Sequence, residues 1–103
     1  MITIHKYELI PGGNGVCEVG TTQGAVFLSV GTQTRYKQDT RDQVEGIFVW
    51  MLLDDQRPTE VRTFHVFGTG HEVPMKIAAM PFVGTVHFKT AQYVFHVFME
   101  PAQ

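Results

Sequence analysis

The chain of 103 residues has one cysteine, Cys17, and few long apolar segments. A single cysteine allows no intramolecular disulfide and no cysteine-based zinc site. The longest apolar run, 47–53, falls far short of the roughly 20 residues that span a bilayer, and no apolar signal segment follows Met1. These absences predict a protein of a reducing cytoplasm with no membrane partner.

Charged side chains are also scarce, at 17% of the residues, with a formal net charge of −2. A protein that grips duplex nucleic acid needs a basic surface, so duplex nucleic acid is not an expected partner. The low share of charge favours a homo-oligomer, in which apolar surface is buried between copies. The Gly-x-x-x-x-Gly-Lys spacing of a phosphate-binding P-loop is missing, which excludes that route to nucleotide hydrolysis.

Histidine is comparatively frequent, yet no His-x-His pair occurs. On a strand, two metal ligands would most simply stand at positions i and i+2, on one face. Three distant histidines could still meet in space, but the sequence itself anchors no metal site, and we expect no metal and no cofactor. The five histidines are His5, His65, His71, His87 and His96.

Composition and pattern predict an all-β fold. Hydrophobic residues make up 44% of the chain and include eight phenylalanines, which excludes disorder and suits a single β domain over 1–103. Short β-branched and aromatic segments alternate with turn residues, which indicates a small β-sandwich or barrel of about seven antiparallel strands. The expected strands are 2–10, 16–20, 25–30, 47–53, 59–67, 82–88 and 92–99.

Four finer expectations follow from the same pattern. The segments 16–20 and 25–30 could form a hairpin, and the polar segment 31–46 could be an exposed loop or an irregular strand extension. The apolar segment 47–53 suits a central strand buried on both faces. Two prolines confine 74–80 to a short helix or a loop.

A four-residue block, Phe-His-Val-Phe, occurs at 64–67 and again at 95–98. The flanking residues differ, so two strands that pair in one sheet explain it better than a structural repeat. The blocks have phenylalanines on both strand faces, and a small core has limited room for them. We therefore expect the rings that do not fit in the core to pack between copies in a homo-oligomer. The candidate rings are Phe64, Phe67, Phe95 and Phe98.

The best candidate site is the turn that follows the first block. Gly68 and Gly70 flank Thr69, and His71 comes next, so backbone amides, a hydroxyl and an imidazole could together bind a small anion or nucleotide. The alternative is that the glycines serve only the turn geometry and that Thr69 and His71 satisfy nearby backbone groups. Earlier in the chain, Arg62 or Arg35 could balance ligand charge, and Tyr36 could stack on a base.

The sequence offers few candidate catalytic residues. A hydrolase that uses His71 with Glu72 is the least favoured function, and we assign no catalytic residue. Asp54 and Asp55 are adjacent turn carboxylates that would point apart, and the sequence places no histidine beside Cys17. A non-enzymatic protein is therefore expected.

Several segments in fixed order resemble a family of small bacteriophage proteins. They are Arg62-Thr63-Phe64, Phe67-Gly68-Thr69-Gly70-His71 with Pro74, Phe82-Val83-Gly84-Thr85-Val86, and Val94-Phe95-His96-Val97-Phe98 with Glu100. The resemblance extends to the strands near 4–7 and 49–54 and so covers most of the chain. It implies a compact β protein in the cytoplasm of a host bacterium, and it brings no established activity.

The resulting expectation is a bacteriophage accessory protein, with a role in countering host defence. It would bind a small anionic signalling nucleotide or a host protein. The alternative is a pure protein-interaction or structural phage module that binds through an aromatic β face or an open edge strand.

Overall fold

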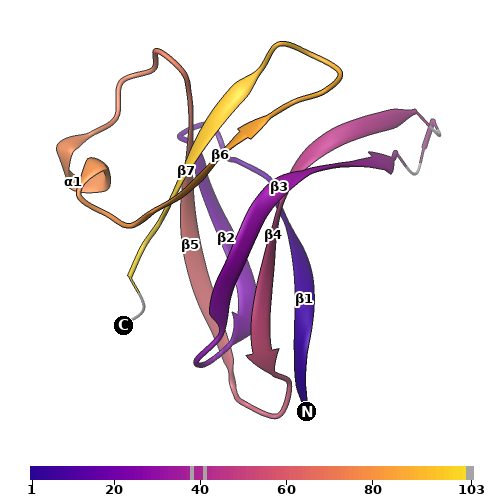
Figure 1. Ribbon diagram of the computed structural model, residues 1–103, viewed down its shortest axis with the longest axis vertical. Coiled ribbons are helices and arrows are strands. Elements are labelled where there is room, and N and C mark those ends of the chain that lie inside the picture. Colours follow the sequence, from indigo (N-terminus) through magenta and orange to yellow (C-terminus); the bar gives the residue numbers. More distant parts are fainter. Residues whose placement is uncertain (38, 41, 102–103) are drawn as a thin grey trace.

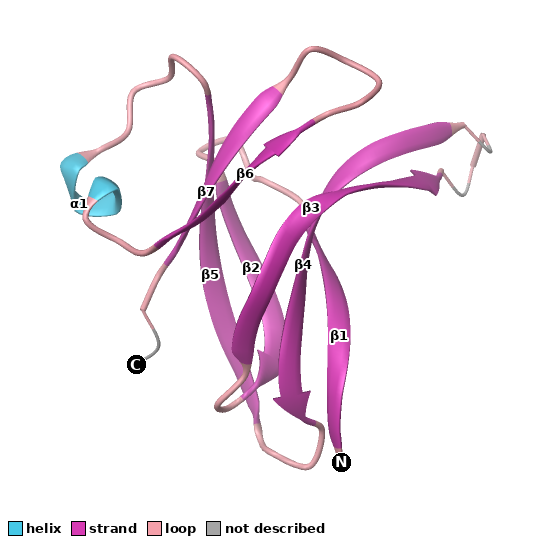
Figure 2. Ribbon diagram, viewed as in Figure 1, coloured by secondary structure: helices cyan, strands magenta, loops and turns pink. Residues whose placement is uncertain are grey.

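The computed structural model describes residues 1–37, 39–40 and 42–101. It confirms the all-β class: seven strands and one short helix follow one another along the described chain (Figures 1 and 2). The elements are β1 (Ile2–Leu9), β2 (Val16–Thr22), β3 (Val26–Tyr36), β4 (Gln43–Asp54), β5 (Thr59–Gly68), α1 (Met75–Ala78), β6 (Phe82–His87) and β7 (Val94–Met99).

The strands form two antiparallel sheets. Sheet A has the order β1-β4-β3, and sheet B has the order β2-β5-β7-β6. The predicted central strand is indeed the middle strand of sheet A. The two Phe-His-Val-Phe blocks pair in sheet B, with Phe67 opposite His96 and His65 opposite Phe98, which confirms that prediction.

The predicted hairpin of 16–20 with 25–30 is wrong, because β2 pairs with β5 while β3 pairs with β4. The chain crosses between the sheets at the turn after β2. There the Gln23 N–H donates to Pro58 O at 2.9 Å, and Ala25 is buried. Ala25 therefore belongs to the core, and the two strands lie on opposite sides of it.

Of the two alternatives for 31–46, the exposed loop is wrong and the strand extension is confirmed, although its ladder is regular. β3 continues to Tyr36 and β4 begins at Gln43, so a regular ladder runs almost to the tip, where the Lys37 N–H donates to Asp42 O at 2.8 Å. The paired ends project from the body of the molecule (Figure 1). Their polar and β-branched side chains need no core behind them, because the ladder itself satisfies the backbone.

The core lies between the sheets and follows from strand alternation. From β4, the odd-numbered residues 47–53 point inward. They meet buried side chains of sheet B, of which Phe64 and Val97 are fully buried. The core consists of Leu9, Cys17, Val19, Ala25, Ile47, Val49, Met51, Leu53, Phe64, Val66, Val86 and Val97.

The expected aromatic surface is therefore corrected. Phe64 is buried and Phe95 packs against the core. Phe67 and Phe98 lie half-buried on the outer face of sheet B, edge to face at a centroid distance of 6.2 Å. The sequence pattern assigned all four rings to a surface between copies. Two of them, Phe64 and Phe95, lie in or against the core between the sheets instead.

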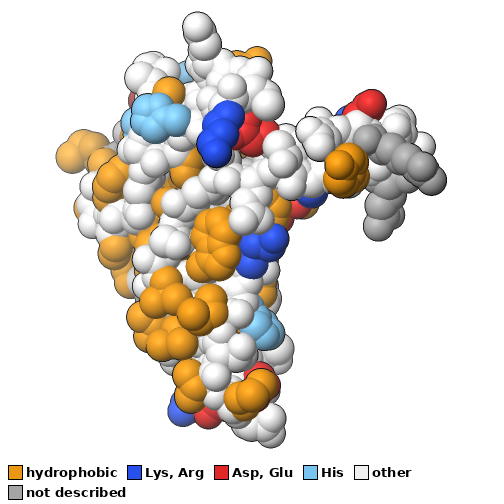
Figure 3. Space-filling model, turned by 45° about the vertical axis from the view of Figure 1, so that its right-hand side comes forward, with side chains coloured by type: hydrophobic (Ala, Val, Ile, Leu, Met, Phe, Trp, Pro, Cys, Tyr) orange, Lys and Arg blue, Asp and Glu red, His pale blue; other side chains and the backbone are white. Residues whose placement is uncertain are grey.

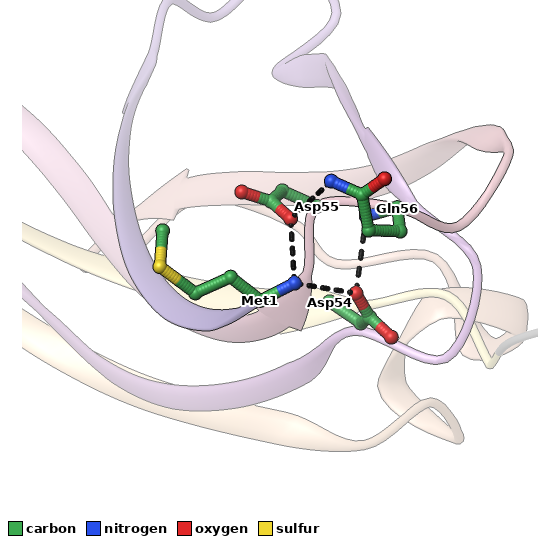
Figure 4. Close-up of polar contacts among 4 residues, drawn as sticks. All are labelled: Met1, Asp54, Asp55 and Gln56. Atoms are coloured by element: carbon green, nitrogen blue, oxygen red, sulfur yellow. Dashed lines mark hydrogen bonds and ion pairs between the residues drawn. The ribbon is translucent and has the colours of Figure 1, made fainter.

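Polar contacts join separate chain segments at both ends of the molecule. At one end, the Glu45 carboxylate of β4 accepts hydrogen bonds from the Lys89 and Thr90 amides at 2.8–2.9 Å and from the Thr90 hydroxyl at 2.8 Å. At the other end, the Met1 ammonium contacts Asp55 at 2.9 Å and Asp54 at 3.3 Å (Figure 4). The two aspartates bind the N-terminal amine rather than each other, which agrees with their turn position.

No helix among the described residues is long and apolar enough to cross a membrane.

Candidate functional site

The Gly68–His71 turn is exposed at its Thr69, Gly70 and His71 positions. Gly70 has φ +88°, a conformation that side chains disfavour. The Thr69 N–H donates to Val94 O and the His71 N–H donates to Gly68 O, both at 3.2 Å. The Thr69 and His71 amides of the turn therefore already have acceptors within the protein, and the expected amide donors, Gly68 and Gly70, remain a prediction.

The hydroxyl of Thr69 contacts a histidine from another strand. Its Oγ1 lies 2.7 Å from His96 Nε2, and Thr85 Oγ1 lies 3.0 Å from His96 Nδ1. β6 and β7 place Thr85 directly opposite His96, while the end of β5 brings Thr69 to the other side of the ring. One imidazole is thus held between two threonine hydroxyls on the outer face of sheet B.

The protonation state of His96 sets what this cluster can donate. A neutral imidazole has one N–H and one bare nitrogen, so one threonine hydroxyl accepts from the ring and the other donates to it. A protonated ring donates on both sides. Both hydroxyl protons are then free for ligand oxygens, and the ring itself carries a positive charge. This arrangement suits an anion better when His96 is protonated.

Sequence reasoning missed His96 and Thr85 as members of this site. The signal was present in the repeated block: antiparallel pairing of 64–67 with 95–98 brings the end of the first strand to the start of the second. Thr85 could not be found in the same way, because its place depends on the pairing of β6 with β7.

The other predicted binding residues lie elsewhere. Arg35 and Tyr36 are on β3 of sheet A, where Arg35 pairs with Glu8 at 2.8 Å and the Tyr36 hydroxyl accepts from Gln43 at 3.1 Å. Arg62 lies on β5, six residues before Gly68, with its side chain 8% exposed. The structure therefore unites Gly68, Thr69, Gly70 and His71 but places none of the three remaining side chains with them.

Arg62 has a structural environment of its own. Its Nη1 donates to Ala25 O at 3.1 Å and its Nη2 lies 3.6 Å from the Met99 sulfur, while its buried Nε has no partner among the described residues. It lines a cleft of about 500 Å³ at the edge of β5. The other lining residues are Glu18, Glu60, Val61, Thr63, Glu100 and Pro101.

His65 is the other buried polar side chain of β5. Neither ring nitrogen has a hydrogen-bond partner among the described residues, and Nε2 lies 3.9 Å from Glu100 Oε2. Within the described part of the chain, the histidines, cysteine and carboxylates form no group of three that could hold a metal ion.

A second feature is the outer face of sheet A. Leu52 points away from the core, opposite to its buried neighbours Met51 and Leu53. Ile4 of β1 and Val26 of β3 pair with it across the ladders, so the three form one row. With the nearby exposed side chains they make the sheet A patch, whose members are 36–65% exposed: Ile2, Ile4, Val26, Leu28 and Leu52.

Figure 3 turns the sheet A side of the molecule forward and shows apolar side chains gathered over its lower half. The prediction that 47–53 is buried on both faces is thus wrong at Leu52. No element among the described residues packs over this part of the outer face, so the strand is covered on one side only. Contiguous exposed aliphatic side chains of this kind mark interaction surfaces.

Comparison with known proteins assigns the chain to one protein family. No curated protein matches the chain, and no solved structure matches it either. One protein-family model, described as a domain of unknown function (DUF7352), matches residues 1–103. The chain therefore belongs to the DUF7352 family.

Proposed function

We propose that this chain is a non-enzymatic accessory protein of a bacteriophage, and that it assembles as a homodimer through the sheet A patch to act by binding other molecules. The single observation that carries this proposal is the uncovered aliphatic row of Ile4, Leu52 and Val26. The phage setting and a role against host defence, in the host cytoplasm, rest on the resemblance of the Phe67–His71 and Val94–Phe98 segments.

The charges around the patch favour a second copy as its occupant. Two residues along β1 from Ile4, Lys6 stands opposite Trp50, while Asp54 stands opposite Ile2 at the other end. A two-fold axis along the Ile4–Leu52–Val26 row would place Lys6 of each copy near Asp54 of the other. Aliphatic side chains would meet at the centre and opposite charges at both ends, which is the complementarity that a symmetric interface needs.

Sedimentation velocity tests this assembly. The wild type should sediment as a dimer, and Ile4→Lys should be monomeric, because it places a charge at the centre of the apolar contact. The control is Val61→Lys on sheet B. Val61 is 60% exposed, close to the 56% of Ile4, and its substitution should leave the dimer intact. A monomeric wild type, or equal effects of the two substitutions, would refute the proposed interface.

A charge exchange tests the orientation. Lys6→Glu and Asp54→Lys should each weaken the dimer, and the double variant should recover part of the loss, because the opposite charges then face each other again. Two losses that simply add would contradict the two-fold arrangement while leaving the apolar contact possible.

The cluster around His96 favours a second binding function, for a small anion such as a phosphate or a nucleotide. Thr69, Thr85 and His96 can present hydroxyl protons and a positive charge on one exposed surface, with His71 on the adjoining turn. A protonated ring would free both hydroxyl protons for the ligand and add a positive charge, so the cluster should bind an anion in preference to a neutral molecule.

Calorimetry with inorganic phosphate and with cyclic and linear nucleotides checks this second function. Thr69→Val keeps the shape of the side chain and removes the hydroxyl, so it should weaken binding, whereas Thr40→Val, on the distant hairpin tip, should not. Absence of binding by every probe would eliminate the site.

A further inference from the structure

β5 is only partly covered on one side. β7 ends at Met99, opposite Phe64, and the Glu100 N–H makes the last contact by donating to Thr63 O at 2.9 Å. β5 itself begins earlier, at Thr59, and pairs with β2 over that whole stretch. Figure 2 shows β5 continuing past the point where the C-terminal end of β7 leaves the sheet. Apart from the Glu100–Thr63 hydrogen bond, the stretch 59–63, roughly 17 Å of strand, thus has one neighbouring strand instead of two among the described residues.

The direction of the backbone groups follows from alternation. The Val66 N–H donates to Gly15 O on the β2 side, and Thr63 O accepts from Glu100 on the β7 side. The β5 ladders contain no register shift, so the N–H and C=O of successive residues point to alternate sides. Val61 therefore points its N–H and C=O to the β7 side, where β7 no longer runs. These are the groups with which an added strand pairs.

The same edge forms the cleft of about 500 Å³ and is strongly acidic. Glu18 from β2, Glu60 from β5 and Glu100 after β7 all line it. The only cation in the lining is Arg62, whose buried side chain donates to Ala25 O and lies 3.9 Å from Glu60. Three carboxylates against one guanidinium leave the cleft negative. Its charge thus complements a basic occupant.

Arg62 supplies a second, independent observation. Its side chain is more than nine-tenths buried, it lines the cleft, and its Nε has no hydrogen-bond partner among the described residues. An unpartnered N–H of a buried cation is costly. A peptide backbone brings carbonyl oxygens to this cleft, the type of acceptor that the Arg62 Nε lacks.

We propose that the 59–63 edge of β5 binds a short extended peptide segment rich in lysine or arginine, which adds to sheet B as a strand in line with β7. Backbone pairing with Val61 would supply the main attachment, and basic side chains at alternate positions would reach Glu18 and Glu100. The site lies on sheet B, so its test does not depend on dimerisation through the sheet A patch.

Fluorescence anisotropy with two labelled peptides tests the proposal. One probe alternates lysine with valine over about six residues, and the other alternates glutamate with valine, so that both extend equally well and only the charge differs. The lysine peptide should bind at least about tenfold more tightly, with an affinity that falls as salt is added. Equal affinity of the two probes would overturn the proposal.

Val61→Pro tests the backbone contact. Proline removes only the N–H that faces the open side and is tolerated on such an edge, so the fold should be kept and binding of the lysine peptide should be lost. Val61→Ala retains the N–H and is the matched control, which should still bind. Binding retained by Val61→Pro would overturn strand addition, even if the acidic residues were needed, because it would indicate a simple cation site.

A direct readout covers the case in which Val61→Pro does not fold. In the wild type, the Val61 amide should exchange its hydrogen with solvent more slowly once the lysine peptide is bound, while the Val26 amide on sheet A should not change. Unaltered exchange at Val61 under saturating peptide would refute the proposal.

Discussion

At the scale of single residues, Glu45 is the side chain whose role is most sharply defined. Desolvation opposes its charge, but hydrogen bonds from the Lys89 and Thr90 amides and from the hydroxyls of Thr90 and Thr32 prevail, and they lower the pKa of Glu45 to about 2. The carboxylate therefore holds the β6–β7 connection against β4.

The low pKa predicts a specific pH dependence. A carboxyl whose pKa is lower in the folded chain stabilises the fold above its unfolded pKa, which is about 4.3, and loses this contribution as the pH falls toward the folded value. Glu45→Gln should therefore lower the melting temperature at neutral pH, and the difference from the wild type should shrink between about pH 4.5 and about pH 2. Thermal unfolding across that range measures it.

The control for Glu45 is Glu72→Gln, a change at an exposed carboxylate in the connection after β5. It should alter the melting temperature little at any pH, because surface substitutions away from such contacts have small effects. A Glu45→Gln difference that stayed constant down to pH 2 would show that the hydrogen bonds do not depend on the charge.

Cys17 gives a second prediction at this scale. Burial raises the pKa of its thiol to about 11, and the side chain lies in the core. A disulfide reagent, whose sulfur the Cys17 thiolate must attack, should thus react slowly with the native protein at pH 8 and quickly in denaturant. Thiol titration measures the reaction rate. A rapid reaction in native buffer would contradict the core position of Cys17.

What the sequence could predict at this scale depended on local chemistry. Gly68 to His71 form one turn because they are consecutive, so their proximity needed no knowledge of the fold. The partnership of Thr69 with His96 arises between residues 27 positions apart and needed the strand pairing. Arg62 looked like a free cation because its burial between Ala25 and Met99 has no local signature.

At the scale of elements, β3 and β6 cross closely where one edge of sheet A meets one edge of sheet B. A Cβ added at Gly84 of β6 would lie 2.5 Å from Val30 Cγ1 of β3, and Gly84 has φ +154°. Gly84→Ala should therefore destabilise the protein by about 1–3 kcal/mol, as expected for an overpacked core position. Chemical denaturation measures the loss.

A double variant separates contact from backbone strain. Val30→Ala removes the atom that the new Cβ would meet, so Gly84→Ala should cost less in that background than in the wild type. The rescue should be incomplete because the backbone conformation still disfavours a side chain. Equal costs in the two backgrounds would mean that β3 and β6 do not press on each other at this position.

The positions of the strands were predictable from the sequence, but their pairing was predictable only in part. Alternation and turn residues located all seven strands, since both are local properties of the chain. The antiparallel neighbours β5 and β7 were found through their shared block, but β2 and β3 looked like a hairpin because only a short turn separates them. Which sheet a strand joins is decided by the buried contacts of Ala25 and its neighbours, and these come from distant segments.

At the scale of the whole molecule, the two sheets share one core, and the Glu45 carboxylate of sheet A holds the β6–β7 connection of sheet B. Side chains of β4 meet those of β5 and β7 in a single cluster, while Glu45 and the Met1 amine join segments at opposite ends of the sandwich. Neither sheet has a second apolar interior of its own among the described residues. The sheets should therefore unfold together, as one cooperative unit.

Trp50, the only tryptophan, lies in β4 of sheet A and makes this testable. Phe64→Ala in sheet B removes a fully buried ring and should cost about 3–5 kcal/mol. If the sheets are one unit, the denaturation midpoint seen by Trp50 fluorescence should fall as far as the midpoint seen by circular dichroism. Phe82→Ala, at a ring that is 55% exposed, should shift both midpoints much less. A Trp50 midpoint that Phe64→Ala leaves unchanged would show instead that sheet A is stable without its partner.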